Sequence, residues 1–187
     1  MKILPTLLLI ILSCSVSFAQ KDLLPGYVIK DNSPDTLRGF IRERSDWSRP
    51  YIEFSRSTDN KMERIPIENV KMFYLKPYDS YYYKTIVDID KKPRLSALLE
   101  NTPGRRIVRD TVLLRLVVGG TASLFAYEDE NAKQHFFIQK NKNDIQELDY
   151  VRYVGPQMKF VEMRYYVEIL KPFVADCPTV YNDGCAL

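Results

Sequence analysis

Short runs of β-branched and aromatic residues alternate with polar positions through most of the chain, from residue 27 to residue 150. In residues 51–55, for example, the apolar Ile52 and Phe54 alternate with more polar neighbours. A period of two is typical of a strand with one buried face, and no stretch of this region keeps the 3.6-residue period of an amphipathic helix. The pattern therefore predicts a series of antiparallel strands.

Turn-forming residues divide this region into ten predicted strands. The strands are residues 27–29, 37–41, 51–55, 62–67, 71–75, 81–89, 111–118, 122–127, 134–140 and 145–150. Between the sixth and the seventh strand, residues 91–106 form a less regular stretch that we expect to be a lid or a crossover. Residues 161–175 are predicted to form a C-terminal helix, which a short tail follows.

The strand at residues 111–118 determines the expected architecture. Its residues 112–118 are apolar at nearly every position, which predicts that protein covers both faces of this strand. An antiparallel β-barrel or a β-sandwich provides such cover. We therefore predict a mainly β fold of about nine to ten strands, a barrel or a sandwich, whose C-terminal helix plugs an open end.

The N-terminal residues have the organisation of a secretory signal peptide. Residues 1–19 combine the basic Lys2, an apolar stretch over residues 7–12 and the small-residue end Ser17-Phe18-Ala19. The apolar stretch is shorter than the roughly 20 residues that a membrane-spanning helix needs. Residues 20–187 are then a single mature domain without a transmembrane segment, exported to the periplasm or secreted.

The three cysteines have different expected roles. Lipidation of Cys14 would anchor the protein to a membrane surface, but Leu12 is larger than the small residue that such signals carry. A lipid-anchored form is therefore the alternative to ordinary cleavage. Cys177 and Cys185 are spaced closely enough for a disulfide in an oxidising compartment, with two unpaired thiols as the alternative.

Composition and charge disfavour a nucleic-acid-binding protein and most classes of enzyme. Lys and Arg number 27 against 24 Asp and Glu, and the net charge of +3 is too small and too evenly spread for a nucleic-acid surface. The single histidine, His135, lies in a predicted strand without an identifiable partner, so we expect a structural histidine. The sequence indicates no catalytic residue, metal site or cofactor. A hydrolase without a recognisable motif, which could use the pair Asp88 and Asp90, is a further alternative.

A cluster of tyrosines is the most unusual compositional feature. Five occur within ten residues, namely Tyr74, Tyr78, Tyr81, Tyr82 and Tyr83. Alternation places Tyr81 and Tyr83 on one face of their strand and Tyr82 on the other. Exposed rings with hydroxyl tips are typical of surfaces that bind proteins or carbohydrates, so Tyr74, Tyr81 and Tyr83 form a candidate binding face. The alternative is that these tyrosines are only good strand formers.

Several segments carry a family resemblance. They are Gly-Tyr-Val-Ile at 26–29, Asp-Thr-Leu-Arg-Gly-Phe-Ile at 35–41, Asp-Thr-Val at 110–112, Gly-Thr-Ala-Ser-Leu at 120–124, Tyr-Glu-Asp-Glu-Asn at 127–131, His-Phe-Phe-Ile at 135–138 and Asp-Cys-Pro at 176–178. Together they resemble the landmarks of a group of uncharacterised exported proteins from Bacteroidetes-type bacteria. In longer members this domain looks like a periplasmic module ahead of an outer-membrane β-barrel. The resemblance implies residence in the cell envelope and supplies no catalytic residue.

These observations predict a non-enzymatic exported domain of the cell envelope. Its partner would be an unidentified envelope protein or surface component, bound through a face or an edge of the sheet. The alternative is a carrier that holds a lipid or a glycan inside a barrel, which the apolar residues 112–118 suggest. The pattern indicates neither the oligomeric state nor the identity of the ligand.

Overall fold

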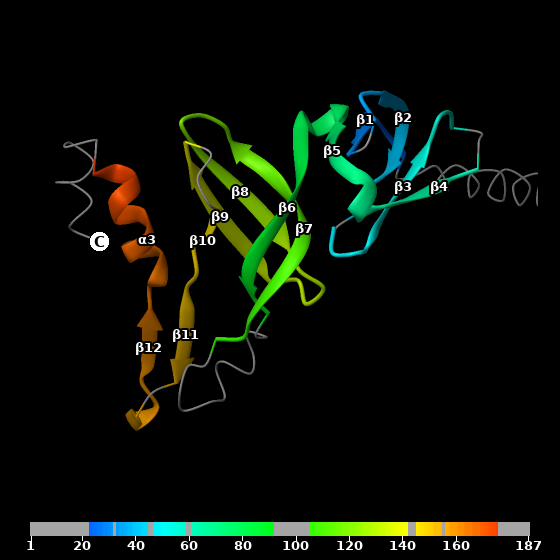
Figure 1. The fold of residues 1–187 in the computed structure, drawn as a ribbon. Coiled ribbons are helices and arrows are strands. Elements are labelled where there is room, and N and C mark those ends of the chain that lie inside the picture. The colour runs from blue at the N-terminus through cyan, green and yellow to red at the C-terminus, as the bar shows by residue number, and fades with distance from the viewer. Residues whose placement is uncertain are drawn as a thin grey trace, which may run out of the picture.

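The computed structural model describes residues 23–31, 33–44, 47–58, 61–91, 105–141, 145–154 and 156–175. Its main element is one antiparallel sheet of ten strands in the spatial order β10-β9-β8-β7-β6-β5-β1-β2-β3-β4 (Figure 1). These strands are β1 (Leu23–Lys30), β2 (Thr36–Arg42), β3 (Tyr51–Ser55), β4 (Glu63–Pro66), β5 (Val70–Leu75), β6 (Ser80–Asp90), β7 (Ile107–Val118), β8 (Ala122–Glu128), β9 (Gln134–Lys140) and β10 (Gln146–Glu147). The prediction of a mainly antiparallel β fold is confirmed.

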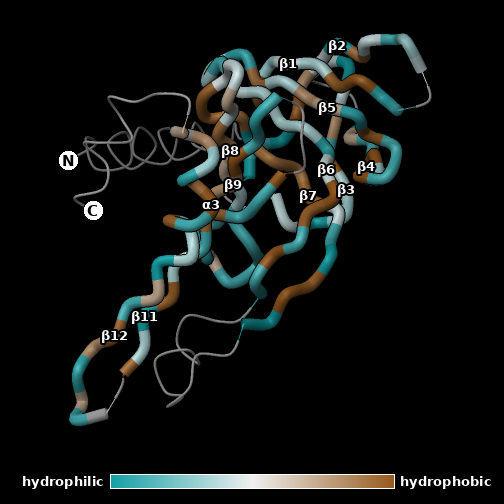
Figure 2. Tube along the Cα trace, turned by 60° about the vertical axis from the view of Figure 1, so that its left-hand side comes forward, coloured by the Kyte–Doolittle hydropathy of each residue, from teal (hydrophilic) through white to brown (hydrophobic). Residues whose placement is uncertain are grey.

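The remaining elements lie around the sheet. Strands β11 (Val151–Val154) and β12 (Phe160–Met163) form a separate hairpin that projects from the body of the molecule (Figure 2). The helix α3 (Tyr165–Val174) follows β12, and the short 3-10 helices are η2 (Ile67–Asn69), η3 (Lys76–Tyr78) and η4 (Pro156–Met158).

The C-terminal helix is confirmed, but it begins later than predicted. Residues 161–163 belong to β12 because they pair with β11, where Val161 lies opposite Tyr153. The helix does not close an end of a barrel. It is attached beside the sheet, where Lys140 Nζ donates a hydrogen bond to the Phe173 carbonyl at 2.9 Å and the Tyr166 N–H donates to the Asp149 carbonyl at 3.1 Å.

Two hydrophobic cores lie on opposite faces of the ten-stranded sheet. The first core belongs to the β1–β7 part and consists of Val28, Ile41, Ile52, Phe54, Ile65, Ile67, Val70, Phe73, Leu75, Tyr82 and Leu113. The second core belongs to the β6–β9 part and consists of Val87, Ile89, Val112, Leu114, Phe125, Tyr127 and Phe137. Strand alternation requires the opposite faces, since Leu113 enters one core while its neighbours Val112 and Leu114 enter the other.

The change of face occurs at β6 and β7, which contribute to both cores. Both faces are covered at Val112, Leu113 and Leu114, as the apolar run predicts, whereas Val117 and Val118 at the end of β7 are exposed. The sheet is curled as a half-barrel, and within the described ranges its edge strands β10 and β4 do not pair with each other. Each core covers one face of the sheet.

Several expectations concern residues outside the described ranges. These are the signal segment 1–19 with Cys14, most of the expected lid at 91–106, and Cys177 with Cys185. Among the helices in the described part of the chain, none has the length and apolar character that a membrane crossing requires.

Candidate functional site

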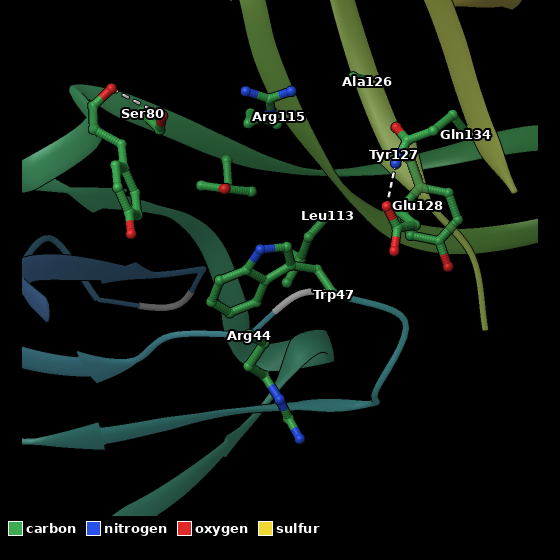
Figure 3. A pocket seen from close by; sticks show the side chains of 11 residues that line it. Arg44, Trp47, Ser80, Leu113, Arg115, Ala126, Tyr127, Glu128 and Gln134 are labelled. Carbon is green, nitrogen blue, oxygen red and sulfur yellow. Dashed lines mark hydrogen bonds between the residues drawn. The ribbon is translucent and has the colours of Figure 1, made fainter. Parts of the chain in front are cut away.

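A cavity of about 400 Å³ opens on the face of the sheet that carries the first core. It lies beyond the edge of that core, where β6 and β7 pass into the second half of the sheet. The lining residues are Arg44, Trp47, Tyr78, Ser80, Tyr82, Leu113, Arg115, Ala126, Tyr127, Glu128 and Gln134 (Figure 3). We call this cavity the Trp47 pocket.

One row of directly opposed residues forms the floor of the Trp47 pocket. Tyr82 on β6 lies opposite Arg115 on β7, Arg115 lies opposite Ala126 on β8, and Ala126 lies opposite Phe136 on β9. Opposed residues of antiparallel strands point to the same face. Ala126 carries only a methyl group between larger neighbours, and it is 3% exposed.

An aromatic group forms one wall of the Trp47 pocket. The Phe73 and Tyr82 rings are stacked, with centroids 4.3 Å apart and planes at 5°, and the half-buried Trp47 indole lies 4.7 Å from Phe73 and 5.1 Å from Tyr82. Burial raises the pKa of the Tyr82 hydroxyl, whereas the Arg115 charge and a hydrogen bond from Trp47 oppose the shift. The wall is therefore largely apolar and carries few polar groups.

Polar side chains stand at two other sides of the pocket. Arg115 is exposed beside Tyr82, and the Gln134 amide donates a hydrogen bond to the Glu128 carboxylate on the opposite side (Figure 3). At the rim, the Tyr78 hydroxyl donates to Glu43, and this hydrogen bond raises the pKa of Tyr78. The pocket thus combines an aromatic wall, one cation and hydrogen-bonding groups of Glu128 and Gln134, as small-molecule sites commonly do.

The Arg44 guanidinium is not part of this polar set. It is directed away from Trp47 (Figure 3) and lies 5.5 Å from the Tyr51 ring, in the geometry of a cation–π contact. Arg115 is the other arginine that lines the cavity.

On the other face of β8 and β9, a cluster of charged side chains is buried. His135 is 2% exposed, its Nδ1 lies 2.6 Å from Glu147 Oε1, and its Nε2 lies 3.3 Å from Asp129 Oδ2. Each ring nitrogen therefore faces a carboxylate oxygen. The prediction of a structural histidine agrees with this burial, although the sequence did not reveal the two carboxylate partners.

Further ion pairs extend this buried charge cluster. Lys133 Nζ lies 3.4 Å from Asp90 Oδ2 and donates to the Asp90 carbonyl at 2.7 Å. The Asp90 N–H donates to Glu147 Oε2 at 2.9 Å. Asp149 is also buried, with Arg105 Nε 2.8 Å from its Oδ2. Burial raises the pKa of Asp149, the charge of Glu147 adds to this shift, and Arg105 opposes it.

The buried charge cluster fixes the hairpin that supplies Glu128 and Gln134 to the pocket. In the turn between β8 and β9, Asp129 Oδ1 accepts hydrogen bonds from the N–H groups of Asn131 at 2.8 Å and Lys133 at 2.9 Å. Glu128 directly precedes this turn. Gln134 directly follows it and is the neighbour of His135 in the sequence. The cluster itself is closed to solvent, so we assign it a structural role.

The predicted tyrosine face is present but is divided between two environments. Tyr74 stacks between Tyr27, at 5.2 Å, and Tyr81, at 4.7 Å, and all three lie on the face opposite the first core. Tyr83 instead packs edge-on against Phe125 of the second core, with centroids 6.4 Å apart. Tyr83 lies on the same face of β6 as Tyr81, but its ring packs on the second core, whereas Tyr74 and Tyr81 adjoin Tyr27.

The predicted carboxylate pair is also divided. Asp88 is exposed and lies 3.8 Å from Arg109, whereas Asp90 is buried in the charge cluster. No group of three or more His, Cys, Asp or Glu residues in the described ranges is arranged to hold a metal ion.

Comparison with known proteins adds no assignment. Scans against protein-family models, curated proteins and solved structures give no match. The case for function therefore depends on the geometry of the Trp47 pocket and the tyrosine face.

Sequence reasoning missed the residues of the pocket. Trp47 is the single tryptophan of the chain and gave a compositional signal, but nothing in the pattern indicated that it lies beside Tyr82. Arg115 interrupts the apolar residues 112–118, and this interruption is the signal that could have identified it as a polar group within the site.

Proposed function

We propose that this chain is a non-enzymatic binding module of the cell envelope, exported by its N-terminal segment, which holds a small ligand in the Trp47 pocket. The observation that carries the proposal is a preformed cavity with an aromatic wall and a few polar groups. Ligand sites of folded proteins commonly have this composition and a volume of about 300–1,000 Å³. The proposal differs from a barrel carrier because the ligand lies in an open pocket and not in a core.

Trp47 makes the proposal directly testable, since the only tryptophan of the chain lines the pocket. Its fluorescence should respond when purified residues 20–187 are titrated separately with monosaccharides, amino acids, nucleosides and short fatty acids. In Ala126→Leu, the larger side chain occupies space at the floor of the pocket. We expect this variant to weaken binding by about tenfold or more through steric exclusion.

The matched control for this variant is Ala122→Leu. Ala122 lies on the same strand and the same face but is exposed and outside the pocket lining. It should bind like the unmodified protein, and circular dichroism should show that both variants are folded. The proposal would be contradicted if Ala126→Leu bound the ligand as tightly as the unmodified protein. It would also be contradicted if none of the four classes changed the fluorescence and native mass spectrometry showed no retained small molecule.

A second candidate function is docking of an envelope protein on the tyrosine face. The specific observation is that Tyr27, Tyr74 and Tyr81 form a continuous row across β1, β5 and β6, next to Arg38 at 5.9 Å from the Tyr27 ring. Tyrosine and arginine are enriched in protein interfaces.

This second candidate predicts that Tyr27→Ala with Tyr81→Ala abolishes capture of a saturable partner from envelope extract, while the fold is retained. Tyr83→Ala is not suitable for this test because it removes a ring that packs on the second core. Unchanged capture by the double variant would remove the tyrosine face from consideration.

A further inference from the structure

We infer that the ligand of the Trp47 pocket is a sugar that carries a single carboxylate group. This inference deepens the proposed function and rests on it. Its starting point is Arg115, which stands in the floor row between Tyr82 and Ala126.

Arg115 differs from an arginine on the same strand and face. Arg109 lies 3.8 Å from the Asp88 carboxylate, so its charge has a partner outside the pocket. Arg115 lines the pocket, and no hydrogen bond or ion pair joins its side chain to another residue of the described ranges. A guanidinium binds a carboxylate or phosphate through two parallel hydrogen bonds.

Glu128 selects between these two anions. It lines the same pocket and lies two residues along β8 from Ala126, which is the direct neighbour of Arg115. Its negative charge disfavours a ligand that carries more than one negative charge. A ligand with one carboxylate directed at Arg115 satisfies the cation and avoids the repulsion that a dianionic phosphate would meet.

The remaining lining indicates what carries the carboxylate. The half-buried Trp47 indole, which Tyr82 supports from within the core, offers an apolar surface against which the C–H groups of a saturated ring can pack. The Glu128–Gln134 pair retains acceptor oxygens for hydroxyl donors. A fatty acid would leave these polar groups desolvated and unpaired, which is costly, whereas a sugar ring satisfies them.

The test titrates Trp47 fluorescence with matched pairs of an acidic sugar and its neutral counterpart. The pairs are glucuronic acid with glucose, galacturonic acid with galactose, and N-acetylmuramic acid with N-acetylglucosamine; acetate and glucose 6-phosphate are added as single probes. We expect at least one acid to bind about tenfold more tightly than its neutral counterpart, because a charge-assisted pair contributes free energy of that order. Acetate and glucose 6-phosphate should bind more weakly than that acid.

Arg115→Gln should abolish the preference for the acid while the neutral sugar binds as before. Arg109→Gln is the matched control, since it removes an exposed arginine of the same strand that does not line the pocket. It should keep the preference.

Three outcomes would overturn the inference: equal affinities within every pair, tighter binding of acetate or the phosphate, or an unchanged preference in Arg115→Gln. The proposed function is tested separately. If another class of ligand binds and Ala126→Leu weakens that binding, the pocket remains a ligand site and only the acidic sugar is rejected.

Discussion

His135→Ala should destabilise the fold by about 3–5 kcal/mol, because the substitution leaves two buried carboxylates without the ring that lies between them. Glu147 Oε1 and Asp129 Oδ2 lie 2.6 and 3.3 Å from the two ring nitrogens, and both acids are nearly closed to solvent. With roughly 2–4 °C per kcal/mol for a domain of this size, the midpoint of thermal unfolding should fall by about 10 °C. Urea unfolding followed by circular dichroism measures the free energy directly.

A double-mutant cycle with Glu147→Gln separates the charge effect from the lost packing of the ring. Removing one carboxylate charge relieves part of the repulsion, so the pair of substitutions should cost less than the sum of the single ones. A free energy of unfolding of His135→Ala within about 1 kcal/mol of the value for the unmodified protein would contradict the stabilising role of this histidine. Phe136→Ala, at the exposed neighbouring position of β9, is the control for general loss of side-chain volume.

The pH dependence provides a second check. Desolvation opposes ionisation of Asp129, but hydrogen bonds from the Lys133 and Asn131 N–H groups and from His135 lower its pKa below the ordinary 3.8. A carboxyl group with a lowered folded-state pKa stabilises the fold above its unfolded-state pKa and loses this effect as the pH falls through the folded-state value. The difference in stability between the unmodified protein and His135→Ala should therefore be full at neutral pH and shrink below about pH 4.

Strand positions could be predicted because each strand carries its own signal. Alternation in residues 51–55 and the turn residues between strands are local features, and β3 spans the predicted residues. The hairpin of β11 and β12 was missed because each strand has four residues and only Val151 among them is buried. Residues 161–163 were assigned to the helix for the same reason.

The placement of the cores and the pocket could not be predicted from local pattern. An apolar run such as residues 112–118 indicates that two faces are covered, but the same run suits a barrel, a sandwich or one sheet with cores on opposite faces. The pocket depends on a pairing between strands distant in sequence. Trp47, in the connection from β2 to β3, lies beside Tyr82 of β6 because β1 pairs with β5. Likewise, Glu147 reaches His135 because β10 pairs with β9.

Gly39→Ala should destabilise the protein by about 1–3 kcal/mol or more, the usual cost of forcing an extra carbon into a filled core. A Cβ at Gly39 would lie 2.2 Å from the Ser55 carbonyl oxygen and 2.8 Å from Phe54 Cζ, and the Phe54 ring is 2% exposed. Relief of the contact with the Ser55 backbone requires β3 to move away from β2. Chemical denaturation followed by circular dichroism measures the loss.

Gly120→Ala is the matched control for this prediction, because the nearest atom to a Cβ there is 3.5 Å away. Both substitutions restrict the unfolded chain to a similar degree, so the difference between them isolates the steric effect in the folded state. The effect should also reach the pocket, since the connection from β2 to β3 carries Trp47 against Tyr82. Gly39→Ala should therefore change the Trp47 emission of the folded protein. If Gly39→Ala is as stable as Gly120→Ala and its emission is unchanged, the close approach of β2 and β3 does not position the pocket wall.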